Sequence, residues 1–91
     1  MNKMKLYQRG GVMNKQLMTY NDIIKDTRQI CRKIGVTFKR ANHDRNGMAA
    51  YIFVLKSSGV CIHNGSFTAN MAWDNALSGN VQNWAAKEVA A

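Results

Sequence analysis

The sequence predicts a single α+β domain, in which a helix is followed by a three-stranded antiparallel β-meander and then by one or two C-terminal helices. Three observations support this fold class. Apolar residues recur with helical spacing between Asn21 and Gly35. Runs rich in β-branched and aromatic residues flank Asn46-Gly47, a dipeptide typical of tight hairpin turns. Alanine-rich segments with helical spacing occupy the last quarter of the chain.

The first predicted helix begins near Asn21, whose side chain can accept hydrogen bonds from the free N–H groups of the first turn. It ends before Gly35, because glycine adopts the left-handed conformation after a helix at little cost. The apolar stripe of this helix comprises Ile23, Thr27, Ile30, Cys31 and Ile34. The opposite face carries Lys25, Arg28, Gln29 and Arg32, and we expect it to be exposed.

Three strands are predicted after this helix, over residues 36–41, 48–56 and 60–64. Polar turn residues at 42–47 join the first two strands, and residues 57–59 join the second to the third. The chain contains no proline, the residue that cannot donate a main-chain hydrogen bond to a neighbouring strand, so no proline interrupts the predicted strands. The order and spacing of the strands predict an antiparallel meander packed by helices.

Side-chain alternation along these strands predicts a second sheet face that carries Tyr51 and Phe53 beside Lys39 and His63. One interpretation is a recognition platform, on which aromatic rings stack bases or anchor a protein while cations hold phosphates. The other interpretation is that the C-terminal helix, the N-terminal segment or a second copy of the chain covers this face. The sequence leaves both open.

Two helices are predicted to end the domain. Ser66 or Thr68 caps the first of them and Gly79 ends it. Its apolar stripe comprises Ala69, Ala72, Trp73, Ala76 and Leu77. A last short helix is expected from Val81 to Val89, with Trp84 and Ala85 on its apolar side.

The N-terminal residues 1–18 are expected to form an extension of a single domain over residues 19–91. The tripeptide Met-Asn-Lys occurs at Met1 and again at Met13, and the codons of Arg9–Val12 can resemble a ribosome-binding site. Both observations favour an alternative start at Met13. No apolar segment follows the N-terminal lysines as in a signal peptide, and the apolar run 49–55 is too short to cross a bilayer. The expected localisation is the cytoplasm, that of the host cell if a phage encodes the protein.

The net charge of +8 in a 91-residue chain favours an acidic partner, either a nucleic acid or a protein surface. Charge that only maintains solubility is the alternative. Glu88 is the only glutamate, which leaves little for catalysis by paired carboxylates. Cys31, Cys61, His43 and His63 lack the spacing of a zinc site. We therefore expect no enzyme, no metal and no cofactor.

The candidate binding residues are basic side chains at the end of the first helix and in the first hairpin, together with the rings of the sheet face. They are Arg28, Arg32, Lys33, Lys39, Arg40, Arg45, Tyr51, Phe53 and His63. Their expected ligand is a phosphate backbone or an acidic groove in a protein. Cations also complement the dipole at the end of a helix, so a solvated helix face remains the alternative.

The order helix, three strands, helix is that of the double-stranded-RNA-binding domain. That family holds phosphates with a lysine cluster at the start of its second helix, whereas the corresponding segment here, SFTANMAWDN, contains no lysine or arginine. The first hairpin loop also lacks the family's Gly-Pro-His pattern. We interpret the similarity as shared topology without shared function.

Residues 59–80, GVCIHNGSFTANMAWDNALSGN, resemble the C-terminal part of small bacteriophage proteins in which a strand, an Asn-Gly turn and a short alanine-rich helix follow one another. Small phage proteins of this size often bind and disable a host machine, and anti-CRISPR proteins are among them. The resemblance implies a non-catalytic accessory protein that inhibits a host nucleic-acid-processing complex by binding an acidic protein or ribonucleoprotein surface. The alternatives are direct binding of DNA or RNA and a structural homo-oligomer, such as a homodimer, that uses the sheet face.

Overall fold

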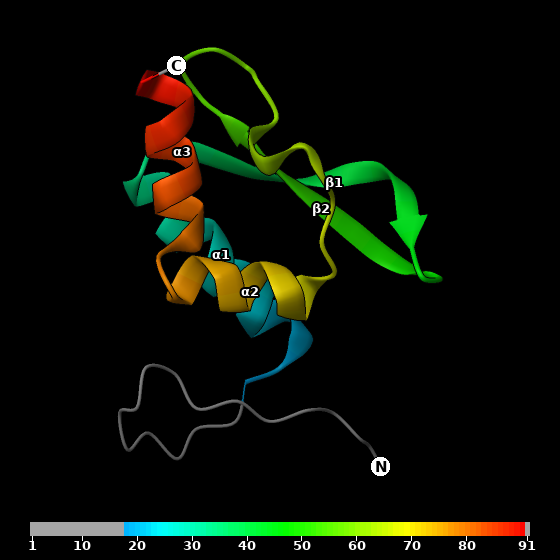
Figure 1. The fold of residues 1–91 in the computed structure, drawn as a ribbon. Helices are drawn as coiled ribbons and strands as arrows, with labels where there is room; N and C mark the ends of the chain where they lie inside the picture. The colour runs from blue at the N-terminus through cyan, green and yellow to red at the C-terminus, as the bar shows by residue number, and fades with distance from the viewer. Residues whose placement is uncertain (1–17, 91) are drawn as a thin grey trace.

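The computed structural model describes residues 18–90 and confirms the α+β class, with one helix, a two-stranded antiparallel sheet and two C-terminal helices (Figure 1). The elements are α1 (Tyr20–Lys33), β1 (Val36–Arg45), β2 (Met48–Leu55), the 3₁₀ turn η1 (Ile62–Asn64), α2 (Ala69–Leu77) and α3 (Asn80–Ala90). Among these residues no helix is both long and apolar enough to cross a membrane. The expected extension over residues 1–18 and the alternative start at Met13 lie, apart from Met18, outside the described residues.

Helix α1 begins earlier than predicted, and the assignment of Asn21 as its N-cap is wrong. Thr19 is the N-cap: its Oγ1 accepts a hydrogen bond from the N–H of Asp22 at 3.1 Å. The Asp22 carboxylate in turn accepts one from the N–H of Thr19, also at 3.1 Å. This capping box satisfies two N–H groups that a helix start leaves free. The predicted apolar stripe is confirmed, because Ile23, Thr27 and Cys31 are buried.

The hairpin forms around Asn46-Gly47 as predicted, and both residues have the positive φ that a two-residue hairpin turn requires. Strand β1 is longer than expected, because residues 42–45 continue it instead of forming a loop. Between Arg40 and Asp44, three residues of β1 lie opposite one residue of β2. This bulge shifts the register by two, which leaves the same side chains on the same face of the sheet.

The predicted third strand over residues 60–64 is wrong, although this segment does lie beside β2. Cys61 bridges to Val54 and Phe67 bridges to Tyr51, both antiparallel. Between the two bridges His63 and Asn64 have φ values of 63° and 46°, which lie outside the extended region. The resulting turn η1 places Ile62 in the core, where it is fully buried. Burial of this side chain thus replaces the strand pairing that the sequence pattern predicts.

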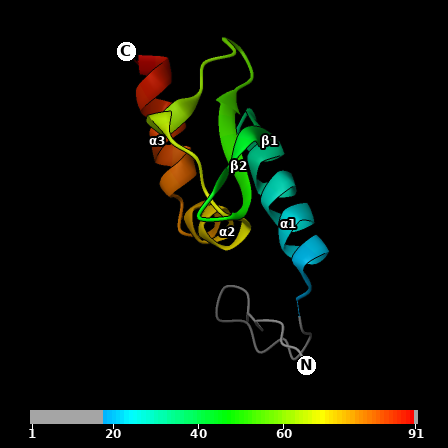
Figure 2. The ribbon, with the colours of Figure 1, turned by 90° about the vertical axis from the view of Figure 1, so that its right-hand side faces the viewer.

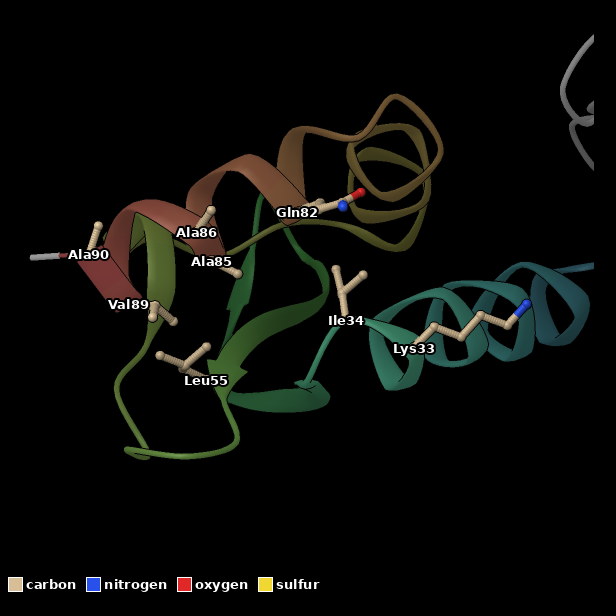
Figure 3. Close-up of a pocket in the computed structure, with 8 residues that line it drawn as sticks. All are labelled: Lys33, Ile34, Leu55, Gln82, Ala85, Ala86, Val89 and Ala90. Carbon is tan, nitrogen blue, oxygen red and sulfur yellow. The ribbon is translucent and has the colours of Figure 1, made fainter.

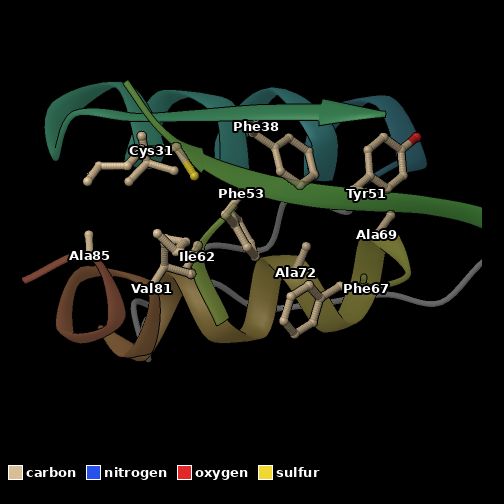
Figure 4. Close-up of a cluster of buried hydrophobic side chains, with 13 residues drawn as sticks. Cys31, Phe38, Tyr51, Phe53, Ile62, Phe67, Ala69, Ala72, Val81 and Ala85 are labelled. Carbon is tan, nitrogen blue, oxygen red and sulfur yellow. The ribbon is translucent and has the colours of Figure 1, made fainter. Parts of the chain in front are cut away.

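The helices cover the face of the hairpin that carries Val36 and Phe38, with α1 along β1, α3 along β2 and α2 across one end (Figure 2). Thr68 caps α2, since its Oγ1 accepts from the N–H of Met71 at 3.4 Å. The indole N–H of Trp73 donates to the Asp26 carboxylate at 2.7 Å and thereby joins α2 to α1. The hydrophobic core (Figure 4) comprises Cys31, Val36, Phe38, Tyr51, Phe53, Leu55, Ile62, Phe67, Ala69, Ala72, Ala76, Val81 and Ala85.

Candidate binding site: a basic groove at the edge of the sheet

A groove of about 260 Å³ lies between α1 and the edge of β1, and we call it the α1–β1 groove. Its lining comprises Arg28, Arg32, Val36, Thr37, Phe38 and Lys56. Three of these six side chains are cationic, and none is a carboxylate. The cations are exposed, while Val36 and Phe38 have only 3% of their surface accessible. The groove therefore combines an apolar floor with a positively charged rim.

Local folding brings these cations together. Arg28 and Arg32 stand four residues apart on α1, so they share one face of the helix. Gly35 follows α1 with a φ of +74°, and this conformation reverses the chain so that β1 starts beside the last turn of α1. The N–H of Lys56 donates to the carbonyl of Gly35 at 3.0 Å, which fixes Lys56 next to the start of β1.

The position of Arg28 is further defined by an aromatic contact. Its guanidinium carbon lies 5.8 Å from the centroid of the Phe38 ring, within the range of a cation–π interaction. The same ring is buried in the core and stacks on the ring of Tyr51, with the two centroids 4.9 Å apart. Arg28 is thus held at the groove by a buried ring, while its N–H groups stay available to an acidic ligand.

The edge of β1 at the groove also exposes main-chain groups. Along β2, the N–H groups of Tyr51 and Leu55 point away from β1, because they donate to Phe67 and Val60. Opposite residues in an antiparallel pair direct their main-chain groups either toward each other or both outward, in alternation. Val36 and Phe38 face Leu55 and Phe53 in the register. Their N–H and C=O groups therefore point outward, to the free edge of β1.

The other predicted basic residues do not join this groove. Lys33 lines a different cavity, described below. Lys39 is exposed on the outer sheet face, since it pairs with Ile52 and not with Tyr51 or Phe53. The guanidinium of Arg40 forms a 3.3 Å ion pair with Asp44, and both side chains are more than half exposed. Arg45 lies at the far end of the hairpin, next to the Asn46-Gly47 turn.

Of the two interpretations left open for the face of Tyr51 and Phe53, the structure has the covered face and not the recognition platform. Tyr51 and Phe53 share the face of Val36 and Phe38, which the helices cover, and Phe53 is fully buried. The Tyr51 hydroxyl meets the Tyr20 hydroxyl at 2.7 Å, a bond that ties the start of α1 to β2. Burial and this hydrogen bond to Tyr51 raise the pKa of Tyr20 to about 12. These rings therefore hold the fold together and are not open for stacking on bases.

His63 is exposed, but it does not lie beside Lys39, Tyr51 or Phe53 as predicted. Its ring stacks on Trp84 of α3, with centroids 3.8 Å apart and planes 13° apart. Phe67 lies beside both rings, with its centroid 5.7 Å from that of His63 and 5.7 Å from that of Trp84. This cluster of three rings joins η1 to α3.

Sequence reasoning missed Lys56 and Thr37 as parts of the site. Lys56 sits at the end of a strand, where a single lysine carries no pattern of its own. Counting residues outward from the Asn46-Gly47 turn would place Lys56 opposite Thr37, and hence close to the end of α1. The bulge changes that partner to Gly35 but keeps Lys56 in the same neighbourhood. The turn was therefore the signal that could have found this residue.

A larger recess of about 460 Å³ separates the end of α1 and the end of β2 from α3 (Figure 3). Its lining comprises Lys33, Ile34, Leu55, Gln82, Ala85, Ala86, Val89 and Ala90. The side chains that point into it are mainly apolar, and Val89 is 69% exposed. This recess offers a surface for apolar contact but has few polar groups that would orient a ligand.

The cysteine and histidine residues form no metal-binding group in residues 18–90, where no three His, Cys, Asp or Glu side chains gather. Cys31 is a free thiol in the core, and burial raises its pKa to about 12. A thiol in that state is a poor nucleophile at neutral pH. Cys61 is also free and is half-buried at its bridge to Val54.

Charge is distributed unevenly along α1. Its first half presents a recess lined by Met18, Asp22, Lys25, Asp26 and Gln29. The capping hydrogen bonds from Thr19 lower the pKa of Asp22, so this end stays anionic. The second half carries Arg28, Arg32 and Lys33. Along α1, the cations therefore lie at the end that borders the α1–β1 groove.

Comparison with known protein families, curated proteins and solved structures finds no match for this chain.

Proposed function

We propose that this protein acts by non-catalytic binding and that the α1–β1 groove docks it on an acidic protein surface. The observation that carries the proposal is the meeting of Arg28, Arg32 and Lys56 in one groove without a lining carboxylate. Charge-assisted hydrogen bonds to a carboxylate are about twice as strong as those between neutral groups. Three cations at one place give both attraction and orientation to an acidic partner.

A protein partner fits the groove better than a nucleic acid does. Proteins that hold single-stranded nucleic acids offer exposed aromatic rings to the bases, whereas Tyr51 and Phe53 are buried. The groove instead places apolar surface from Val36 and Phe38 beside its cations. Such a mixture suits side chains of a protein, while a phosphate backbone would use only the charges.

The biological setting we propose is the one that the phage resemblance implies. In it, the protein is an accessory factor that binds an acidic surface of a host nucleic-acid-processing complex and inhibits that complex. Binding through one small groove needs no cofactor and no chemical step. Inhibition would follow if the docked domain keeps other parts of the complex away from this acidic surface. These parts would be the complex's own basic substrate-binding parts or its moving parts.

A retention experiment with matched charge variants tests this function. The groove variant R28Q/R32Q/K56Q removes the three groove cations, and the control variant K25Q/R45Q/K87Q removes three cations that do not line the groove. Both variants have the same net charge. The immobilised protein and both variants are incubated with nuclease-treated and untreated bacterial lysate. We expect a nuclease-resistant host complex to be retained by the control variant and lost by the groove variant.

Other outcomes contradict the proposal. Retention that disappears after nuclease treatment would indicate direct nucleic-acid binding. That outcome should also show a steep salt dependence, with about 10³-fold weaker binding of an oligonucleotide between 50 and 200 mM salt if six or more phosphates are contacted. Equal loss of retention in both triple variants would show that net charge, and not the groove, causes binding.

A further inference from the structure

We propose that the acidic partner enters the α1–β1 groove as an extended peptide that adds a strand to the free edge of β1. This inference rests on the proposed function, because it specifies how the acidic protein is held. The peptide backbone would pair with Val36 and Phe38, and its acidic side chains would meet the groove cations. The occupant is thus an acidic segment in β conformation.

The first support is the direction of the main-chain groups. Val36 and Phe38 line the groove, and their N–H and C=O groups point to the free edge of β1. Among residues 18–90, no main-chain hydrogen bond reaches these groups from a neighbouring element. An open sheet edge of this kind is a template for another strand. Peptide recognition by strand addition uses such an edge for affinity and the alternate side chains for specificity.

The second support is the placement of charge around this edge. Side chains of an added strand alternate between the two sheet faces. On the α1 side they would meet Arg28 and Arg32, which line the groove. Helix α1 itself lies along β1 (Figure 2). On the other side they would meet Lys56, and farther along the strand Lys39, which is exposed on the outer face. A peptide with carboxylates would find a cation on both faces.

The third support is the contrast with the other edge of the same sheet. Tyr51 of β2 also directs its N–H outward, but there the carbonyl of Phe67 accepts it at 2.7 Å, and Phe67 donates back at 2.9 Å. The chain therefore closes the edge of β2 with its own residues. Among residues 18–90, the edge of β1 has cations in place of such a segment. Cations along an edge repel a second basic copy of this chain while attracting an acidic strand.

The test uses a defined probe, a twelve-residue peptide of alternating glutamate and threonine, acetylated and amidated, with the full-length protein. Two derivatives carry N-methyl groups on alternate residues, one on all threonines and the other on all glutamates. Each removes the N–H donors from one edge of the peptide strand and leaves its charge unchanged. Binding is measured by NMR titration, together with amide exchange of Phe38.

We expect the unmodified peptide to bind and to slow the exchange of the Phe38 amide. One of the two N-methylated derivatives should bind about tenfold more weakly or worse, because only one edge of the peptide pairs with β1. The R28Q/R32Q/K56Q variant should weaken binding by a similar factor, and the K25Q/R45Q/K87Q control should not.

Two failures are distinguishable. If both N-methylated derivatives bind like the parent peptide, or if the Phe38 amide is unaffected, strand addition is overturned while the acidic-partner function stands. If the peptide does not bind at millimolar concentration, or binds both triple variants equally, the proposed function fails as well. A twelve-nucleotide oligothymidylate that binds the groove in preference to the peptide would assign the site to nucleic acid.

Discussion

The two edges of the small sheet present the same kind of main-chain groups but meet different surroundings. At the edge of β2, the chain returns through η1 and bridges at Cys61 and Phe67. At the edge of β1, the neighbours are Arg28, Arg32 and Lys56 around a groove. The chain itself closes one edge as part of the fold, and the other edge is the one that we propose for binding. A protein with so small a sheet can separate these two roles by edge.

The largest expected effect concerns the closed edge. Phe67→Ala should lower the free energy of unfolding by about 3–5 kcal/mol. The Phe67 side chain is only 6% exposed, and the centroid of its ring lies 5.3 Å from that of Phe53. Urea denaturation measures this loss. Val60→Ala, at an exposed site on the same segment, is the control and should change stability by about 0.5 kcal/mol or less. Equal effects of the two substitutions would contradict a structural role for this edge.

The next effect concerns the open edge and separates binding from stability. The variant R28Q/R32Q/K56Q should keep the stability of the wild type within about 1 kcal/mol, since its three side chains are exposed and their loss leaves no buried group without a partner. The same variant should lose about tenfold or more of its affinity for an acidic partner. Thermal unfolding and NMR titration measure the two quantities. A variant that binds normally but unfolds easily would invert the roles of the two edges.

A smaller effect on stability is expected at the contact between Tyr20 and Tyr51, which joins α1 to the hairpin. Tyr20→Phe should cost about 1 kcal/mol of stability, because it removes the 2.7 Å hydroxyl contact with Tyr51. The pKa of Tyr20 is raised to about 12 in the folded state and is about 10 in an unfolded chain. The folded state therefore holds this proton more tightly.

The contribution of Tyr20 to stability is then fully present below pH 10 and is lost as the pH rises from 10 to 12. Denaturation curves recorded across this range should decline less steeply for Tyr20→Phe than for the wild type. Parallel curves for the two proteins would show that the hydroxyl pair does not hold α1 in place. That result would weaken the account of how the α1–β1 groove is shaped.

The smallest effect distinguishes the two thiols. Cys61 is half-buried at the bridge that closes the β2 edge, whereas Cys31 is fully buried and its pKa is raised to about 12. A disulfide reagent should therefore modify Cys61 well before Cys31 in the folded protein. Mass spectrometry of peptides after a short exposure identifies the modified residue. Preferential modification of Cys31 would mean that the core opens more readily than the bridge at Cys61.

Local sequence signals predicted most of the fold. The stripe of α1, the Asn46-Gly47 turn, the cap at Thr68 and both C-terminal helices depend on residues close together in the chain, and each is confirmed. The third predicted strand failed because its outcome depends on tertiary packing. Ile62 gains more from full burial than from an extended pairing, and residues 63 and 64 accommodate the turn with positive φ.

The candidate site was predicted only in part. Arg28 and Arg32 were placed on an exposed helix face from their spacing, and they do line the groove. The faces of β2 were assigned correctly relative to each other, but nothing local showed which of them the helices cover. Tyr51 and Phe53 were therefore placed on the wrong side. Lys56 joins the site through long-range pairing with Gly35, which no local pattern shows and which only counting outward from the Asn46-Gly47 turn could have approached.

The difference between the two edges is tested most directly by amide hydrogen exchange in the free protein. Tyr51 and Phe38 both point their N–H groups away from the partner strand, but within residues 18–90 only that of Tyr51 is bonded, to Phe67. We expect slow exchange at Tyr51 and fast exchange at Phe38, with slow exchange at Thr37 and Lys39, which pair with β2. Slow exchange at Phe38 as well would show that the edge of β1 is already closed, and would contradict the binding role that we propose for it.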